Sequence, residues 1–201
     1  MGSIAMREFP IPRPRLTKAA LIALAVLAVP AASRAQAPTA AASQPRDGAH
    51  DFDWEFGAWA TSLRYLANPL SPEPDRWVEY QGTSIVRPAM DGQANLVELD
   101  VAGPAGRIRG LSLRLYNPQT RQWSLNFASM RSGQLTTPTY GGFDAAGRGL
   151  FYGQDSVDGR VILVRFVVTP QGRDTYRFVQ SFSADAGATW EDNWIAIDRR
   201  R

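Results

Sequence analysis

The residue types that most often carry out catalysis are nearly missing from this sequence. It has no cysteine and a single histidine, His50, which lies ahead of the first predicted strand. A Ser-His-Asp or Cys-His arrangement needs one of these residues held in place by the fold, so neither is supported. Zinc sites favour the same two residue types, and we predict no metal site. Haem needs an axial ligand, usually histidine, and we predict no cofactor.

Carboxylates are the remaining candidates for chemistry. Asp51, Asp53 and Glu55 alternate just before the first predicted strand and could bind calcium, but they lack the glycine-spaced loop of an EF-hand. We interpret them as residues that cap a short helical turn and keep the segment soluble. No glycine-rich phosphate loop follows a predicted strand, so nucleotide binding has no support.

Polar residues inside otherwise apolar strands point to a different possibility, because a barrel can gather them around a ligand cavity. Leucines at 111, 113 and 115 alternate with Ser112, Arg114 and Tyr116, and we expect Arg114 and Arg165 to face solvent. Elsewhere both faces of the strands carry large side chains. The candidate ligand-binding residues are Glu79, Asn126, Tyr152, Gln180, Asn193 and Trp194. In one version of this hypothesis, Glu79 and Asn193 converge to give an aromatic pocket its polar anchor.

The stretch SADAGATW, residues 183–190, matches the Asp-box, a hairpin motif repeated around sialidase propellers. A propeller needs the motif in several blades, whereas this sequence carries it once and is too short for six blades. We interpret it as a structural turn. Asp185 accepts hydrogen bonds from turn amides, Gly187 adopts a positive φ, and Trp190 resumes the strand.

Strands are the elements that must position these residues. Short alternating runs recur between turn residues at spacings of about 8–12 residues, and most connections are short, which favours an antiparallel meander. We predict an all-β fold: an up-and-down antiparallel β-barrel of about 8–10 strands with a short helical turn near residues 51–57. A sandwich is the alternative. The predicted strands cover residues 59–66, 77–87, 95–101, 111–116, 123–128, 140–144, 149–155, 161–169, 175–183 and 190–198.

The start of the first predicted strand, Gly57-Ala58-Trp59, resembles the Gly-x-Trp signature of lipocalins and other calycins. The resemblance implies that Trp59 plugs the closed end of a barrel and is covered by an arginine from the last strand. Arg199 and Arg200 are the candidates for that arginine.

A wider resemblance covers about residues 50–198. FDWEFGAW near the start, YNPQTRQWSLNFAS in the middle and FSADAGATWEDNW near the end are similar to a bacterial family catalogued as a domain of unknown function. Its members open with Phe-Asp-Phe-Trp-x-Gly-x-Trp, whereas this sequence carries Trp54-Glu55-Phe56 where Phe-Trp-x is usual. The resemblance implies a calycin-like barrel and supplies no activity.

The first residues have the features of an export signal. A basic leader precedes a 14-residue apolar run, residues 19–32, and Ser33-Arg34-Ala35 suits signal peptidase. The run is shorter than the roughly 20 residues that span a membrane, so we predict a cleaved Sec-type signal peptide over residues 1–35 and no membrane span after cleavage. Residues 36–49 are predicted to be a flexible spacer, and residues 50–201 a single barrel domain. The expected location is periplasmic or secreted, in a bacterium.

Removal of this leader changes the charge balance. The chain has 22 basic and 19 acidic residues, and the leader holds five of the basic ones and one acidic one, which leaves 17 and 18 from Gln36 onward. Nucleic-acid binding normally needs a basic surface, so we predict none. The hypothesis is an exported barrel that binds a small, partly apolar molecule. The alternatives are an enzyme that uses a buried carboxylate such as Glu79, or a packed barrel with a structural or interaction role. No oligomeric state is predicted.

Overall fold

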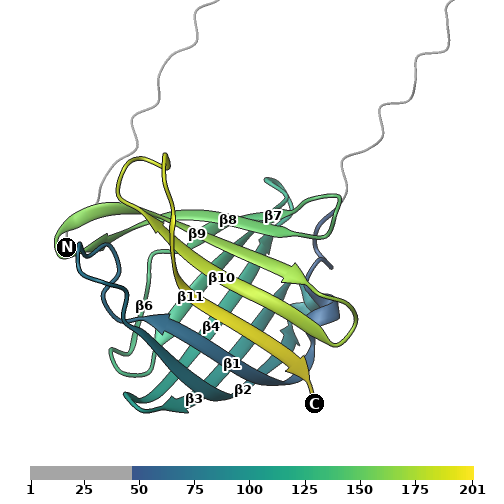
Figure 1. Cartoon of the computed structure of the whole chain (residues 1–201). Helices are drawn as coiled ribbons and strands as arrows, with labels where there is room; N and C mark the ends of the chain where they lie inside the picture. The colour runs from purple at the N-terminus through teal and green to yellow at the C-terminus, as the bar shows by residue number, and fades with distance from the viewer. Residues whose placement is uncertain (1–46) are drawn as a thin grey trace, which may run out of the picture. The chain divides into compact units, whose positions relative to one another are not determined.

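Ten antiparallel strands form one closed up-and-down ring in the computed structural model, which describes residues 47–201 (Figure 1). The predicted signal peptide and most of the predicted spacer lie outside these residues. The strands are β1 (Gly57–Leu66), β2 (Trp77–Ala89), β3 (Ala94–Gly103), β4 (Gly106–Asn117), β5 (Gln122–Ser129), β7 (Thr139–Phe143), β8 (Gly149–Val157), β9 (Arg160–Pro170), β10 (Thr175–Ser183) and β11 (Glu191–Arg200). Each predicted strand corresponds to one of them.

Closure of the ring depends on the pairing of β1 with β11, which runs from Trp59↔Arg200 to Tyr65↔Trp194. The other strands pair with their neighbours in sequence, so the ring has no free edge. The two-residue strand β6 (Gln134–Leu135), which the sequence did not predict, pairs only with β5. The seam between β5 and β7 is short, with three residue pairs, and the residues that follow β6 border the interior there.

Helical structure in residues 47–201 is limited to two 3-10 turns, η1 (Asp53–Glu55) and η2 (Met90–Gly92). The first is the predicted N-terminal turn, and the second connects β2 to β3. No helix in this part of the chain is long and apolar enough to cross a membrane.

One end of the barrel is closed by the residues around Trp59, as the calycin resemblance implied. Trp59 is fully buried and donates its indole N–H to the Glu55 carbonyl oxygen, 2.7 Å away. The Arg200 guanidinium lies 4.2 Å from the Trp59 ring centroid and donates hydrogen bonds to the carbonyl oxygens of Phe56 and Trp54, at 3.0 and 2.7 Å. Arg200, rather than Arg199, is therefore the arginine that covers the tryptophan.

The contacts around Trp59 also explain why the motif begins with glycine. Gly57 has a φ of +126°, a conformation that side chains rarely adopt, and a Cβ at this position would lie 3.2 Å from an Arg200 guanidinium nitrogen. The absence of a side chain at residue 57 therefore leaves space for the arginine that covers Trp59.

The packed part of the chain begins earlier than predicted. Gly48, which we placed in the flexible spacer, is buried. Its N–H donates to the Tyr116 hydroxyl at 3.1 Å, and its carbonyl oxygen accepts the Trp123 indole N–H at 2.8 Å. The predicted boundary at His50 is too late because these main-chain contacts, which side-chain composition does not reveal, attach residue 48 to the barrel.

The expected orientation of β4 is wrong. Ser112 and Arg114 face the interior, whereas the three leucines of the strand face outward, with Leu115 43% exposed. The inward arginine is possible because the buried Glu55 carboxylate supplies its counter-charge. Arg165, by contrast, lies on the outer wall as expected, over the Trp190 ring.

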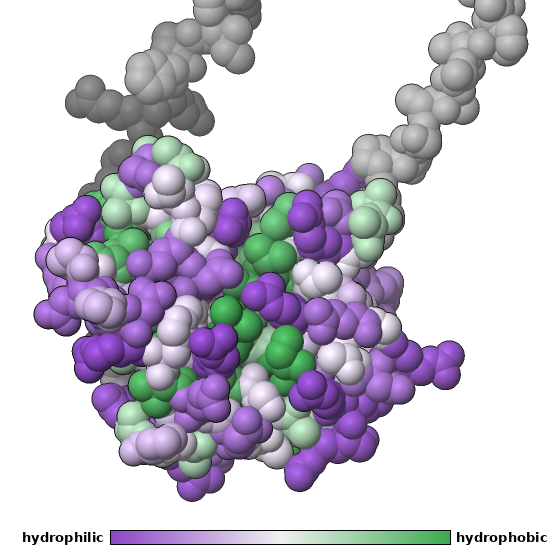
Figure 2. All heavy atoms as spheres, in the orientation of Figure 1, coloured by the Kyte–Doolittle hydropathy of each residue, from purple (hydrophilic) through white to green (hydrophobic). Residues whose placement is uncertain are grey.

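Hydrophobic side chains also occur on the outer wall of other strands. Figure 2 shows the face formed by β1, β11 and β10, where a narrow strip of hydrophobic atoms runs between hydrophilic ones. Val179 alternates with the inward residues of β10 and pairs in register with Val167 and Ile195. When both faces of a strand carry apolar residues, the alternation of apolar and polar residues no longer identifies the face that points inward.

The Asp-box stretch forms the hairpin turn between β10 and β11. The Asp185 carboxylate accepts hydrogen bonds from the Thr189 N–H and hydroxyl, at 2.9 and 2.6 Å. Gly187 has a φ of +92°, and the Trp190 indole donates to the Gly187 carbonyl oxygen. The two hydrogen bonds from Thr189, with a further one from the Ser183 hydroxyl, hold the pKa of Asp185 down at about 2. The interpretation as a structural turn is confirmed.

Candidate functional site: a cavity with a charged floor

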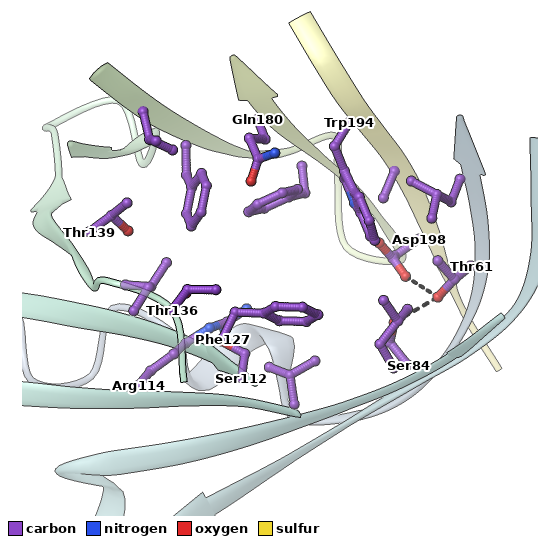
Figure 3. A pocket seen from close by; sticks show the side chains of 18 of the residues that line it. Thr61, Ser84, Ser112, Arg114, Phe127, Thr136, Thr139, Gln180, Trp194 and Asp198 are labelled. Atoms are coloured by element: carbon purple, nitrogen blue, oxygen red, sulfur yellow. Dashed lines mark hydrogen bonds between the residues drawn. The ribbon is translucent and has the colours of Figure 1, made fainter. Parts of the chain in front are cut away.

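A cavity of about 160 Å³ lies inside the barrel (Figure 3). This volume is similar to the engineered protein cavity of about 150 Å³ that holds a benzene molecule. Its walls are mainly aliphatic and aromatic, and its mouth is bordered by Thr136, Thr137 and Asp155. Towards the closed end it has a polar floor formed by Glu55, Thr61, Ser84, Arg114, Tyr176 and Asp198.

A buried ion pair forms one side of the floor. Glu55 is 0% exposed, and both terminal nitrogens of Arg114 donate to its carboxylate, one of them at 3.1 Å. The same guanidinium lies 4.2 Å from the Phe52 ring centroid. Our interpretation of Glu55 as a solubilising cap is therefore wrong, because removal of its charge from water is compensated by a two-point pair with an arginine.

Asp198 forms the other side of the floor and lacks such a partner. It is 2% exposed and accepts a hydrogen bond from the Thr61 hydroxyl, which lies 2.8 Å from the Ser84 hydroxyl. No salt bridge joins it to a cation within residues 47–201. Burial, together with the nearby Glu55 charge, raises the pKa of Asp198 to about 6, although the hydrogen bond from Thr61 acts in the opposite direction.

Tyr176 lies between these two carboxylates. Burial raises its pKa well above the ordinary value, and the negative charges of Glu55 and Asp198 act in the same direction. The phenol therefore stays protonated and available as a donor. Its hydrogen bond to Asp198 lowers the pKa of that carboxyl, and so opposes the effect of burial.

The raised pKa of Asp198 predicts how stability depends on pH. Between about pH 4 and pH 6 the folded protein holds a proton that the unfolded chain releases, so the free energy of unfolding falls as the pH rises through this interval. Above pH 6 the penalty is constant. Asp198→Asn removes this penalty, so we expect the free energy of unfolding of the variant to exceed that of the natural protein by about 1–3 kcal/mol at pH 7.5. Near pH 4 the expected difference is close to zero. Urea unfolding at the two pH values measures both.

A matched control for this experiment is Asp185→Asn in the exposed hairpin turn. Because folding lowers the pKa of Asp185, its charge contributes to the stability of the folded protein above its unfolded pKa. This contribution is lost as the pH falls towards 2, which is the opposite pH dependence to that of Asp198. If Asp198→Asn changed stability by the same amount at pH 4 and pH 7.5, Asp198 would not be the titrating group.

Two of the six predicted ligand-binding residues line the cavity, and a third contacts one of them from behind. Gln180 and Trp194 line it, and the Gln180 amide nitrogen donates to the Asn193 side-chain oxygen at 2.7 Å. Asn193 is buried behind them, and its own side-chain nitrogen has no partner among the described residues. An irregularity in the pairing of β10 with β11 lies directly beside these residues, where the register shifts after Gln180.

The other three lie on the outside of the barrel. Glu79 is exposed, because alternation along β2 turns Tyr80 inward in its place. Asn126 donates to the Leu113 carbonyl oxygen, and Tyr152 is half exposed against the Trp190 ring. The predicted convergence of Glu79 with Asn193 is wrong. The buried carboxylate that lines the cavity, the position expected for Glu79, is that of Asp198.

Sequence reasoning also missed Thr139, whose side chain faces the cavity in Figure 3. Thr139 is 2% exposed, and its hydroxyl has no hydrogen-bond partner among residues 47–201. A signal for Asp198 was available, since it follows Trp194 and Ala196 at the two-residue spacing of a single strand face. Thr139 gave no comparable signal, because it is the first residue of β7, a short, glycine-bearing strand.

No protein-family model and no curated protein sequence matches the chain. Among solved structures, the S-type phycobiliprotein lyase CPES from Guillardia theta is similar in fold, with 10% identity, a TM-score of 0.53 and coverage of 78% of this chain and 98% of that chain. EF1p2_mFAP2b bound to DFHBI has 8% identity, covers 77% and 99%, and has a TM-score of 0.42. A de novo designed fluorescence-activating β-barrel has 13% identity, covers 78% and 100%, and has a TM-score of 0.40. The likeness to the lyase supports a calycin-type barrel fold.

Proposed function

We propose that this protein is an exported calycin-like barrel that binds a small, partly apolar molecule in its internal cavity. The observation that carries the proposal is the cavity of about 160 Å³, which combines aromatic walls with polar groups at its floor and mouth. Ligand pockets are typically mostly apolar with a few placed polar groups, and this cavity has that composition.

The unsatisfied hydroxyl of Thr139 supports a bound molecule rather than an empty interior. A buried polar group without a partner costs about 1–3 kcal/mol, and a ligand that bonds to it removes that cost. Gln180 also points into the cavity (Figure 3), and its amide nitrogen is already engaged by Asn193. The Gln180 carbonyl oxygen is therefore free to accept a hydrogen bond from a ligand.

The family and location belong to the same proposal. The resemblance over residues 50–198 supports membership of the bacterial family that opens Phe-Asp-Phe-Trp-x-Gly-x-Trp, and the features of residues 1–35 support export to the periplasm or the medium. The intact mass of the protein recovered from the periplasm tests the cleavage after Ala35, and a stoichiometric additional mass in the native spectrum would identify a ligand class.

An enzyme that uses a buried carboxylate is the second candidate. Since Glu79 is exposed, this alternative depends on Asp198, whose pKa of about 6 lies close to the pH at which acid–base groups act efficiently. If Asp198→Asn leaves every detectable turnover of a bound molecule unchanged, this alternative loses its residue.

Filling the cavity from its wall is expected to weaken binding. Ser112 faces the interior between Val97 and Phe127, so Ser112→Leu adds apolar volume where the ligand would lie. We expect the affinity for benzyl alcohol, a ring-sized probe, to fall by about tenfold or more, measured by calorimetry. Ala60→Leu, on the exposed outer face of β1, is the control and should leave the affinity unchanged. Equal affinities for all three proteins would contradict binding in the cavity.

A further inference from the structure

We propose that the molecule bound in the cavity carries an ammonium group on a ring-sized apolar body, and that the Asp198 carboxylate receives this group. The inference rests on the proposed binding function and names the chemical class of the ligand. It depends on the charges that line the cavity, on the position of Asp198 and on the aromatic side chains around it.

The charges that line the cavity do not balance. Its lining includes three acidic residues, Glu55, Asp155 and Asp198, and one basic residue, Arg114. Both terminal nitrogens of Arg114 are hydrogen-bonded to Glu55, so the arginine neutralises that carboxylate. The charges of Asp155 and Asp198 have no counter-charge in the lining. Asp155 is exposed at the mouth, where water screens it, whereas Asp198 is buried. A cation inside the cavity would supply the counter-charge that Asp198 lacks.

Asp198 is placed to receive such a group. In Figure 3, Asp198, Thr61 and Ser84 lie together on one side of the cavity, with Trp194 beside them. Thr61 donates to one carboxylate oxygen of Asp198, so its hydroxyl fixes the orientation of the carboxylate. An ammonium group donates up to three hydrogen bonds and accepts none, which matches a carboxylate flanked by hydroxyl oxygens.

The walls favour the same ligand. Phe127, Phe166, Phe178 and Trp194 line the cavity, and the Phe166 and Phe178 ring centroids are 5.2 Å apart. Aromatic faces attract ammonium ions and pack against apolar rings. An anionic ligand would instead meet the uncompensated charge of Asp198 in a medium of low dielectric constant. The cavity should therefore discriminate strongly between ligands of one shape that differ only in charge.

The test compares benzylamine, benzyl alcohol and benzoate, which share a ring and differ in charge. Calorimetry with the full barrel at pH 7.5 should give benzylamine an affinity about tenfold to a hundredfold higher than that of benzyl alcohol, since both can donate a hydrogen bond to Asp198 but only the ammonium also forms an ion pair with the buried carboxylate. Benzoate should bind weakest. Asp198→Asn should reduce the affinity for benzylamine to that for benzyl alcohol and leave the latter within about threefold. Glu79→Gln removes a carboxylate from the outer wall and should change neither value.

The outcomes separate the two proposals. If benzyl alcohol binds the natural protein as tightly as benzylamine does, the assignment of an ammonium ligand is overturned and the binding cavity stands. The same holds if Asp198→Asn keeps the preference for benzylamine, because the preference would then arise elsewhere. If none of the three probes binds, both proposals fail together.

Discussion

Replacement of Arg114 by methionine is expected to lower the free energy of unfolding by about 3–5 kcal/mol. The substitution preserves most of the side-chain volume but leaves the Glu55 carboxylate, which is 0% exposed, without its counter-charge. It also removes the guanidinium from the face of the Phe52 ring. Urea unfolding at pH 7.5 and low ionic strength, followed by tryptophan fluorescence, measures the change.

Two variants show whether this loss comes from the unpaired charge. The double variant Glu55→Gln/Arg114→Met removes both charges and should recover most of the stability, because apolar or neutral replacements of buried pairs are often well tolerated. Arg165→Met removes an arginine that contacts the Trp190 ring on the outer wall, and should cost less than about 1 kcal/mol. If Arg114→Met proved as mild as Arg165→Met, the ion pair at the floor would not hold the barrel together.

The substitution Trp59→Ala is expected to cost about 3–5 kcal/mol, the range found when large aromatic side chains are removed from a core. Trp59 is fully buried within the core cluster at the closed end, and its loss also removes the hydrogen bond to the Glu55 carbonyl oxygen. Arg200 would keep its bonds to the carbonyl oxygens of Phe56 and Trp54 but lose the ring that it covers. Thermal and urea unfolding measure the loss.

Trp190→Ala is the matched control, since Trp190 is also contacted by an arginine but lies half-buried on the outer wall. We expect it to cost about 1 kcal/mol, roughly the value of a partly exposed cation–π contact with limited burial. A Trp59→Ala variant no less stable than Trp190→Ala would mean that the closed end does not depend on its tryptophan.

The strands and their order could be predicted from the sequence because the signals for them are local. Alternation, glycine-bearing turns and short connections lie within about ten residues of one another, and they give ten strands and a meander. The closed end at Trp59 was instead implied by the resemblance of Gly57-Ala58-Trp59 to the calycin signature. Residues 183–190 were interpreted correctly from turn chemistry alone.

The inward and outward faces could not be predicted in the same way. Arg114 faces the interior because Glu55, 59 residues earlier, lies there to pair with it. Asp198 is held by Thr61, 137 residues earlier. Neither pairing is visible until the ring closes, and outer-wall residues such as Val179 make the pattern of the strands ambiguous. Gln180, Asn193 and Trp194 were identified because polar and aromatic residues occur together there.

The ring of strands also determines the order in which the molecule can assemble. One neighbour of β1 is β2, the next strand in the chain, but the other is β11, the last strand. β1 and β10 therefore each have an unpaired edge until residues 191–200 have been synthesised. Bare edges are templates for pairing with other chains, and contacts between residues far apart in sequence form slowly. The barrel can therefore close only after β11 has been synthesised. The same strand carries Asp198, so the buried, uncompensated carboxylate of the cavity is added in the step that closes the ring.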